Sequence, residues 1–179
     1  PAHEIGHIHQ KAINWPGCTE SSNNLFSNYV LYKLGKYCSR GSELFHLADA
    51  RFVEGQAWFD MGNPHHMNED TEIHMRMYWQ LWNYYHRCGY NIDENNPGAA
   101  QLKLAVKASQ AAHEDLSDFF ELWGFFIPGK GVIEQYGTYD YLVTEEMIRK
   151  AKAEMSIYPK PKHAFQYIED RKAGDIGLD

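Results

Sequence analysis

Three observations predict a mainly α-helical fold. Apolar residues recur at three- and four-residue spacing through most of the chain, which is the pattern of helices with one buried face. Glycine and proline pairs lie between these segments and would end helices there. Only residues 127–143 combine glycines with β-branched and aromatic residues. A chain of 179 residues can bury one sizeable core, so we expect a single domain over residues 1–179.

The first two expected helices lie on either side of Pro16–Gly17. The first runs from about Ala2 to Ile13 and ends before this pair, because proline interrupts a helix. The second follows Thr19, whose hydroxyl suits an N-cap, and continues to Tyr37. These two helices should therefore run back along each other.

The rest of the chain alternates helical segments with short breaks. Helices are expected over residues 42–62 in one or two pieces, 71–89, 99–114, 115–126, 145–155 and 162–172. Thr144 is placed to cap the helix that begins at residue 145. Asn95–Gly98 is expected to form a turn or loop, and residues 127–143 one short strand or an irregular loop.

Composition and charge exclude several classes of protein. An aromatic content of 15% and a hydrophobic content of 44% indicate a folded chain. A net charge of -7 with no Lys/Arg-rich run makes nucleic acid an unexpected partner. No apolar stretch approaches the roughly 20 residues of a transmembrane helix, and none has the pattern of a signal peptide. Cys18, Cys38 and Cys88 leave open one disulfide with one thiol, or three thiols.

The segment HEIGH near the start of the chain has the pattern of a metal site. His3 and His7 are four residues apart, so a helix presents both imidazoles on one face to one metal ion. Glu4 can reach the water that the metal activates and act as general base in peptide hydrolysis. Gly6 lies inside this helix, where glycine costs about 1 kcal/mol relative to alanine, and this indicates close packing against the helix.

A third metal ligand is expected from the second helix. The longer pattern HExxHxxGxxH does not continue here, because Gln10 replaces its glycine and Ile13 its third histidine. Glu20 lies in the first turn of the second helix, and a reversal at Pro16–Gly17 would return it to the histidine face. Three protein ligands with one open position are typical of a catalytic zinc site. The alternative role for Glu20 is a partner of the helix dipole.

Two stretches carry a family resemblance. HEIGHIHQ…PGCTESSNNLFSNYV resembles the zinc-binding core of the enhancin-like and mucin-degrading metallopeptidases, whose pattern is HExGHxxQ, a spacer, and then a glutamate that opens the next helix. DLSDFFELWGFF resembles their FF-x-x-WGF segment. The resemblance implies a gluzincin, a zinc endopeptidase with His3, His7 and Glu20 as ligands and Glu4 as catalytic base.

The same resemblance implies a setting and a substrate. Such enzymes act outside the cell or on its surface, on heavily O-glycosylated proteins such as mucins. A gluzincin places a β-sheet before its zinc helix, and one edge strand pairs with the extended substrate. We therefore expect this chain to be the helical, C-terminal part of a larger α+β catalytic domain, without its upstream sheet.

Three further residues are candidates for supporting roles. Asn24, one turn beyond Glu20, could orient the metal ligands through hydrogen bonds, with capping or packing as the alternative. His74 and Tyr78 are four residues apart on one expected helix, and either could donate a hydrogen bond to a developing oxyanion.

Aromatic and aliphatic residues at helical spacing are expected to pack in the core. One such stripe lies in the second helix and another in the helix over residues 115–126. The members of these stripes are Leu25, Phe26, Tyr29, Val30 and Tyr37 in the first, and Leu116, Phe119, Phe120 and Trp123 in the second.

Two other classes of function compete with the peptidase. One is a peptidase-like module that binds glycoproteins or glycans with little turnover. Retention of Glu4 together with Glu20 argues against this class, because decay of a peptidase usually begins at the catalytic glutamate. The other is a helical structural domain in which HEIGH occurs by chance. Metal analysis would separate this last class from the first two.

Overall fold

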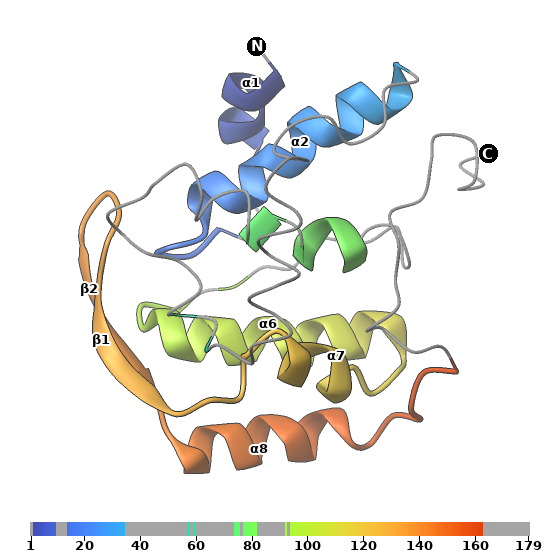
Figure 1. Ribbon diagram of the computed structural model, residues 1–179, viewed down its shortest axis with the longest axis vertical. Coiled ribbons are helices and arrows are strands. Elements are labelled where there is room, and N and C mark those ends of the chain that lie inside the picture. The colour runs from blue at the N-terminus through green and yellow to red at the C-terminus, as the bar shows by residue number, and fades with distance from the viewer. Residues whose placement is uncertain are drawn as a thin grey trace.

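The computed structural model describes residues 2–9, 14–34, 57, 59, 74–75, 77–81, 92 and 94–162. The elements in chain order are α1 (Ala2–His9), α2 (Thr19–Lys33), α6 (Pro97–Ala112), α7 (Ser117–Leu122), β1 (Gly129–Glu134), β2 (Thr138–Val143) and α8 (Glu145–Met155). Figure 1 shows α6 alongside α8, and the β1–β2 hairpin along one side of the molecule between α8 and the α1–α2 pair. The described part is mostly helical, as the sequence predicts.

A tight reversal joins α1 to α2. Residues 16–18 form the turn, and Gly17 has a φ of +91°, which an L side chain rarely adopts. The helix expected over Ala2–Ile13 is present to His9, and residues 10–13 lie outside the described part. The expected reversal at Pro16–Gly17 is confirmed.

The start of α2 differs from the prediction by one residue. Thr19 is the first residue of α2 rather than its N-cap, because the Cys18 carbonyl already accepts a helical hydrogen bond from the Ser22 N–H at 3.0 Å. The Thr19 hydroxyl instead donates to Asn14 Oδ1 at 2.8 Å, across the reversal. Cys18 is buried as a thiol in the same turn.

Gly6 is the point of closest approach between α1 and α2. A Cβ added at Gly6 would lie 2.2 Å from Asn23 Oδ1 and 3.0 Å from Cδ2 of Phe26. No side chain fits in this space, so the glycine allows the two helices to touch. The close packing that Gly6 indicates in the sequence is confirmed.

The apolar stripe of α2 is not its buried face. Leu25 is buried, but Phe26, Tyr29 and Val30 are about two-fifths exposed, with values of 39%, 41% and 42%. The expectation that this stripe packs in the core is therefore wrong for these three residues. The buried face consists mainly of small polar residues: Ser21, Ser22, Asn23, Asn24 and Ser27.

The N-terminus of α6 is fixed to β2. Asn96 caps α6 by accepting the Gly98 N–H on Oδ1 at 2.9 Å. The same side chain accepts the Leu142 N–H and donates to the Leu142 carbonyl, both at 3.0 Å, as a neighbouring strand would. The turn expected over Asn95–Gly98 is correct only for its first half, because Pro97 already begins the helix, a position that proline favours.

Residues 127–143 form a hairpin rather than one short strand or an irregular loop. β1 pairs antiparallel with β2 from Gly129↔Val143 to Glu134↔Thr138. A three-residue turn of Gln135, Tyr136 and Gly137 joins the strands, and the Gln135 N–H donates to the Gly137 carbonyl at 3.0 Å. Tyr136 adopts a left-handed φ of +52° in this turn.

The hydrophobic core draws on α6, α7, β2 and α8, and also on the buried segment around Trp79 and on Trp15, Cys18 and Leu25. The stripe predicted over residues 116–123 is confirmed, because Leu116, Phe119, Phe120 and Trp123 are all buried. The Phe120 ring lies 5.2 Å from the Phe119 ring and 4.8 Å from the Phe125 ring, centroid to centroid. These edge and tilted contacts add to the burial of large aromatic surfaces.

Polar side chains of Thr144 and Gln101 hold the elements around the described core, and only the contact of Thr144 is predicted from the sequence. Thr144 caps α8 as expected, since Oγ1 accepts the Met147 N–H at 3.3 Å. Gln101, buried in α6, donates to the Phe125 carbonyl at 2.7 Å and accepts from the Tyr141 hydroxyl at 3.1 Å.

The helices predicted over residues 42–62 and 162–172 fall outside the described part, apart from Ala57, Phe59 and Lys162. Within the part that the structure describes, no helix is long and apolar enough to cross a membrane.

Candidate metal centre

The reversal between α1 and α2 brings a histidine and a glutamate together. His7 Nε2 lies 3.5 Å from Glu20 Oε2, although twelve residues separate them in the chain. Both side chains are partly buried, with exposed fractions of 30% and 16%. The return of Glu20 to the HEIGH helix, expected from the sequence, is present in the structure.

The spacing of these two atoms suits ligands of one metal ion. Ligands about 2.0–2.1 Å from one zinc ion, at a tetrahedral angle, are about 3.4 Å from each other. The observed separation of 3.5 Å matches this value and exceeds the usual length of a hydrogen bond between an imidazole N–H and a carboxylate. A neutral imidazole and a carboxylate are also donors that zinc accepts. The residues present therefore fit a zinc ion.

His3 and Glu4 lie on the same helix. α1 spans Ala2–His9, so His3 is one helical turn before His7 and shares its face. The His3 side chain lies outside the described part, and among the described residues no group of three or more metal-binding side chains is found. Glu4 is exposed on α1.

The turn of the β1–β2 hairpin adds a tyrosine to this centre. The Tyr136 hydroxyl donates to Glu20 Oε1 at 2.5 Å. This hydrogen bond, then burial, and then the negative charges of Glu20 and Glu4 raise the pKa of Tyr136 from its usual value. His7, Glu20 and Tyr136 thus come together where α1, α2 and the hairpin meet.

The hairpin turn is also bound to the reversal before α2. Gln135 Oε1 accepts the N–H groups of Gly17 at 3.0 Å and of Thr19 at 3.3 Å. These N–H groups lie at the N-terminal end of α2, where the helix itself supplies no acceptor. Gln135 therefore accepts N–H groups at the start of α2 as an N-cap side chain would, although it lies more than a hundred residues later in the chain.

Asn24 lies on the buried face of α2, as does its neighbour Asn23. Asn23 contacts Gly6 of α1 and so lies between the two helices of the centre. Their polar side chains replace the apolar contacts that a helix pair usually buries. This placement fits either support of the ligands or packing, the two roles that the sequence left open for Asn24.

His74 and Tyr78 lie in a buried helical segment. The Tyr78 ring packs edge-on against Trp15 with centroids 6.1 Å apart. Burial first, and then the charge and hydrogen bond of Cys18, raise the pKa of the Tyr78 hydroxyl well above its usual value. This environment favours a role for Tyr78 in packing beneath the α1–α2 reversal over contact with a substrate.

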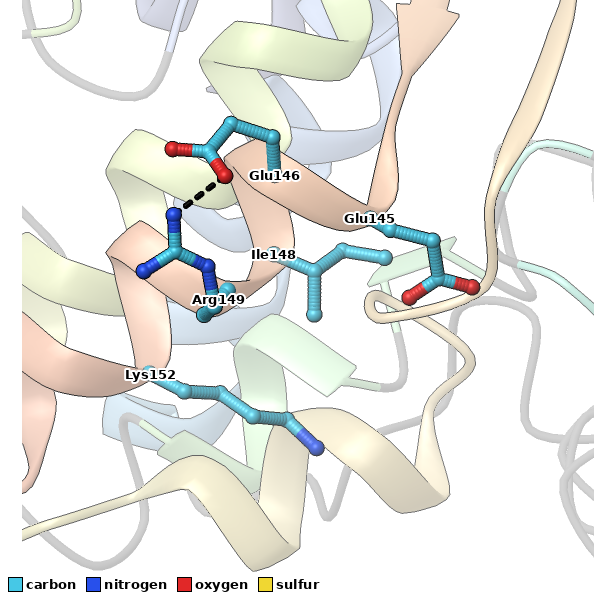
Figure 2. Close-up of a pocket in the computed structure, with 5 residues that line it drawn as sticks. All are labelled: Glu145, Glu146, Ile148, Arg149 and Lys152. Atoms are coloured by element: carbon cyan, nitrogen blue, oxygen red, sulfur yellow. Dashed lines mark hydrogen bonds and ion pairs between the residues drawn. The ribbon is translucent and has the colours of Figure 1, made fainter.

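A hollow of about 490 Å³ lies along α8 and is lined by Glu145, Glu146, Ile148, Arg149 and Lys152. Figure 2 shows Arg149 paired with Glu146, which lies one helical turn earlier on α8. Lys152 Nζ lies 2.9 Å from Glu121 Oε2 of α7. The five lining residues include no histidine or cysteine, so the hollow lacks the nitrogen and sulfur donors of a typical zinc site.

Comparison with protein families decides the class of this chain. The model of the family described as "Peptidase M60, enhancin and enhancin-like" matches residues 1–124, more than half of the chain. The chain belongs to this family. The matched region contains α1, α2, α6 and α7, whereas the β1–β2 hairpin and α8 follow it.

Two solved structures resemble this enhancin-like chain over nearly its whole length. One is a metallopeptidase from Bacteroides thetaiotaomicron, with 56% identity, a TM-score of 0.81, and coverage of 96% of this chain and 32% of its own. The other is a metallopeptidase in complex with Tn antigen, with 57% identity, a TM-score of 0.81, and coverage of 96% and 35%. The enhancin-like chain thus spans about a third of the length of these structures. No curated protein matches it.

Tyr136 and Gln135 of the enhancin-like chain are the site residues that sequence reasoning missed. A glycine after Tyr136, with alternating strands on both sides, is a hairpin signal and could have located the turn. The contact with Glu20, 116 residues away, depends on how the hairpin docks, and no local pattern encodes that.

Proposed function

We propose that the chain carries the catalytic centre of a zinc-dependent endopeptidase of the gluzincin type. His3, His7 and Glu20 would hold the ion, and Glu4 would act as general base. The observation that carries this proposal is the 3.5 Å separation of His7 Nε2 and Glu20 Oε2, brought about by the α1–α2 reversal. Membership of the metallopeptidase family supports it independently.

Each residue has a distinct task in this scheme. When bound, zinc polarises the scissile carbonyl and lowers the pKa of the attacking water to about 7. Glu4 accepts a proton from that water as it attacks, and returns the proton to the leaving amide nitrogen. Glu4 follows His3 on α1 and is exposed, so it is accessible to water and to a bound peptide.

We further propose that the substrates are O-glycosylated, mucin-like proteins, met outside the cell or at its surface. The similar metallopeptidase in complex with Tn antigen supports this substrate class, because Tn antigen is an O-linked glycan. The similarity covers 96% of this chain at 57% identity.

Digestion of a mucin-type glycoprotein by the full-length protein tests the proposal. Three forms are compared: wild type, Glu4→Gln and the control Glu154→Gln, an exposed glutamate on α8. Loss of the general base should lower kcat/KM by about 10²- to 10⁴-fold. Glu4→Gln should still contain one zinc per chain, since Glu4 is not a ligand, and Glu154→Gln should match wild type in both respects.

Two results would reject the proposal. Equal cleavage by wild type and Glu4→Gln would place the chemistry elsewhere. Binding of the glycoprotein and zinc by wild type without cleavage would favour the glycoprotein-binding module.

A further inference from the structure

We propose that Tyr136 is a positioning residue for the metal ligand Glu20, and that the β1–β2 hairpin turn serves as a clamp on the metal centre. This inference rests on the proposed zinc site and extends it to a segment that lies beyond the residues matched by the family model. The clamp consists of the turn residues Gln135, Tyr136 and Gly137.

The two oxygens of Glu20 have different partners. Oε2 lies 3.5 Å from His7 Nε2, at the separation expected of two zinc ligands. Oε1 accepts the Tyr136 hydroxyl at 2.5 Å. A carboxylate held in this way has one oxygen occupied by a protein donor and the other directed at the metal position. Tyr136 therefore fixes which oxygen of Glu20 is offered to the ion.

The backbone of the turn is held where the hydroxyl can act. Gln135 Oε1 binds the N–H groups of Gly17 and Thr19, at 3.0 and 3.3 Å. Ile133, just before the turn, lies so close to Gly17 that a Cβ there would meet Ile133 Cδ1 at 3.0 Å. The clamp thus binds Gly17 and Thr19, just before Glu20, as well as Glu20 itself.

The conformation of Tyr136 is not explained by packing. Its side chain is 78% exposed, and its φ of +52° is unfavourable for a residue with a Cβ. An exposed aromatic ring in a strained turn buries little apolar surface in return. The hydrogen bond to Glu20 is the contact that gives this residue a role at this position.

Removing the hydroxyl should weaken zinc binding. Hydrogen-bond partners of metal ligands typically contribute about 10- to 100-fold in metal affinity. Without the Tyr136 hydroxyl the Glu20 carboxylate can rotate in the metal-free protein. Zinc binding must then order this carboxylate, and the entropy cost makes the free energy of binding less favourable. We therefore expect Tyr136→Phe to raise the zinc Kd by about 10- to 100-fold.

The experiment measures zinc Kd by competition with a chromophoric chelator, in the full-length protein. The variants are Tyr136→Phe and the control Tyr139→Phe, which removes a hydroxyl from the same hairpin next to Gly137. Tyr139→Phe should leave the Kd within about threefold of wild type. A change of that size is well below the 10-fold expected for a hydrogen-bond partner of a metal ligand. Thermal unfolding of the metal-free forms should shift by less than about 2 °C, since an exposed hydroxyl contributes little to folding.

A second variant, Gln135→Ala, releases the turn from Gly17 and Thr19 without touching Glu20. It should raise the zinc Kd in the same direction as Tyr136→Phe. If Tyr136→Phe lowers kcat but leaves the Kd unchanged, Tyr136 acts on the substrate and the positioning role is rejected. Equal effects of Tyr136→Phe and Tyr139→Phe would also reject it. Failure of the proposed zinc site is distinguishable, because wild type itself would then bind no zinc at this centre.

Discussion

Helices α2 and α6 are of similar length but bury opposite kinds of surface. α6 buries mainly aliphatic side chains, such as Leu102, Leu104 and Val106, against α8 and β2. α2 buries serines and asparagines and leaves Phe26, Tyr29 and Val30 outside. α1 shows the same inversion, since Ile5 and Ile8 are 56% and 74% exposed. The α1–α2 pair therefore buries mainly polar side chains, whereas α6 buries mainly apolar ones.

The difference separates the part that supplies most of the hydrophobic stabilisation from the part that holds the proposed metal centre. Burial of apolar surface stabilises a fold without fixing directions, as in the α6–α7–α8 core. Buried polar groups must be hydrogen-bonded, and those bonds fix side chains in specific orientations. The α1–α2 pair thus gives up hydrophobic stabilisation for a defined arrangement around His7 and Glu20. Stability and zinc affinity should then respond to different mutations.

The largest expected effect on stability comes from the apolar part. Phe120 is fully buried between Phe119 and Phe125. Phe120→Ala should lower the free energy of unfolding by about 3–5 kcal/mol, because it removes the ring and leaves a cavity. Urea denaturation measures this change. The zinc Kd of the folded fraction should stay at the wild-type value, and a large rise in Kd would break the separation of the two parts.

A smaller effect is expected at the helix contact of the metal centre. Gly6→Ala places a Cβ 2.2 Å from Asn23 Oδ1, so the helices must move apart. Overpacking of this kind costs about 1–3 kcal/mol. It should also weaken zinc binding, because His7 and Glu20 lie on the two helices that separate.

Gly129→Ala is the matched control for this change. A Cβ at Gly129 would meet its nearest neighbour, Cε1 of Tyr141, at 3.8 Å, an ordinary contact. Calorimetric titration with zinc compares the two variants. An unchanged Kd in Gly6→Ala would show that the α1–α2 distance does not control the site.

The smallest effect concerns a polar link within the stable part. Asp115 is buried and binds the Ser117 N–H at 3.0 Å and Lys160 Nζ at 3.1 Å. Burial alone would raise the pKa of Asp115, but the hydrogen bonds of Ser117 and the hydrogen bond and charge of Lys160 together lower it. Asp115→Asn should cost on the order of 1 kcal/mol at pH 7.

This cost should depend on pH in a defined direction. A depressed folded pKa contributes stability that is fully present above the unfolded pKa of about 3.9 and is lost as the pH falls through the folded value. The difference between wild type and Asp115→Asn should therefore shrink in acid. Asp118, whose side chain is 71% exposed, also binds Lys160, and Asp118→Asn should change stability by less than about 0.5 kcal/mol. A difference that grows in acid would contradict the assignment.

The sequence predicts the helices well where the residues at apolar spacing are also the buried ones. The stripe of Phe119, Phe120 and Trp123 and the Thr144 cap are local patterns, and both are present. The return of Glu20 to His7 also follows from local signals, since a Pro-Gly reversal between two helices leaves few geometries.

The failures have a common physical cause. The apolar residues of α2 predict a helix correctly but indicate the wrong buried face, because contacts at a polar centre outweigh apolar spacing there. The sequence does not predict the second strand of the hairpin, because the glycines of this segment are also typical of a loop. The role of the hairpin turn depends on docking to Gly17, Thr19 and Glu20. Long-range polar contacts of this kind have no local sequence pattern.

The most direct test of the metal centre is anomalous diffraction at the zinc absorption edge, from crystals of the zinc-loaded protein. We predict one peak about 2.0–2.1 Å from both His7 Nε2 and a Glu20 oxygen, with His3 as the third protein ligand. Tyr136 should remain hydrogen-bonded to the other oxygen of Glu20. Crystals with saturating zinc that show no peak between α1 and α2, or a peak bound by other residues, would contradict the account.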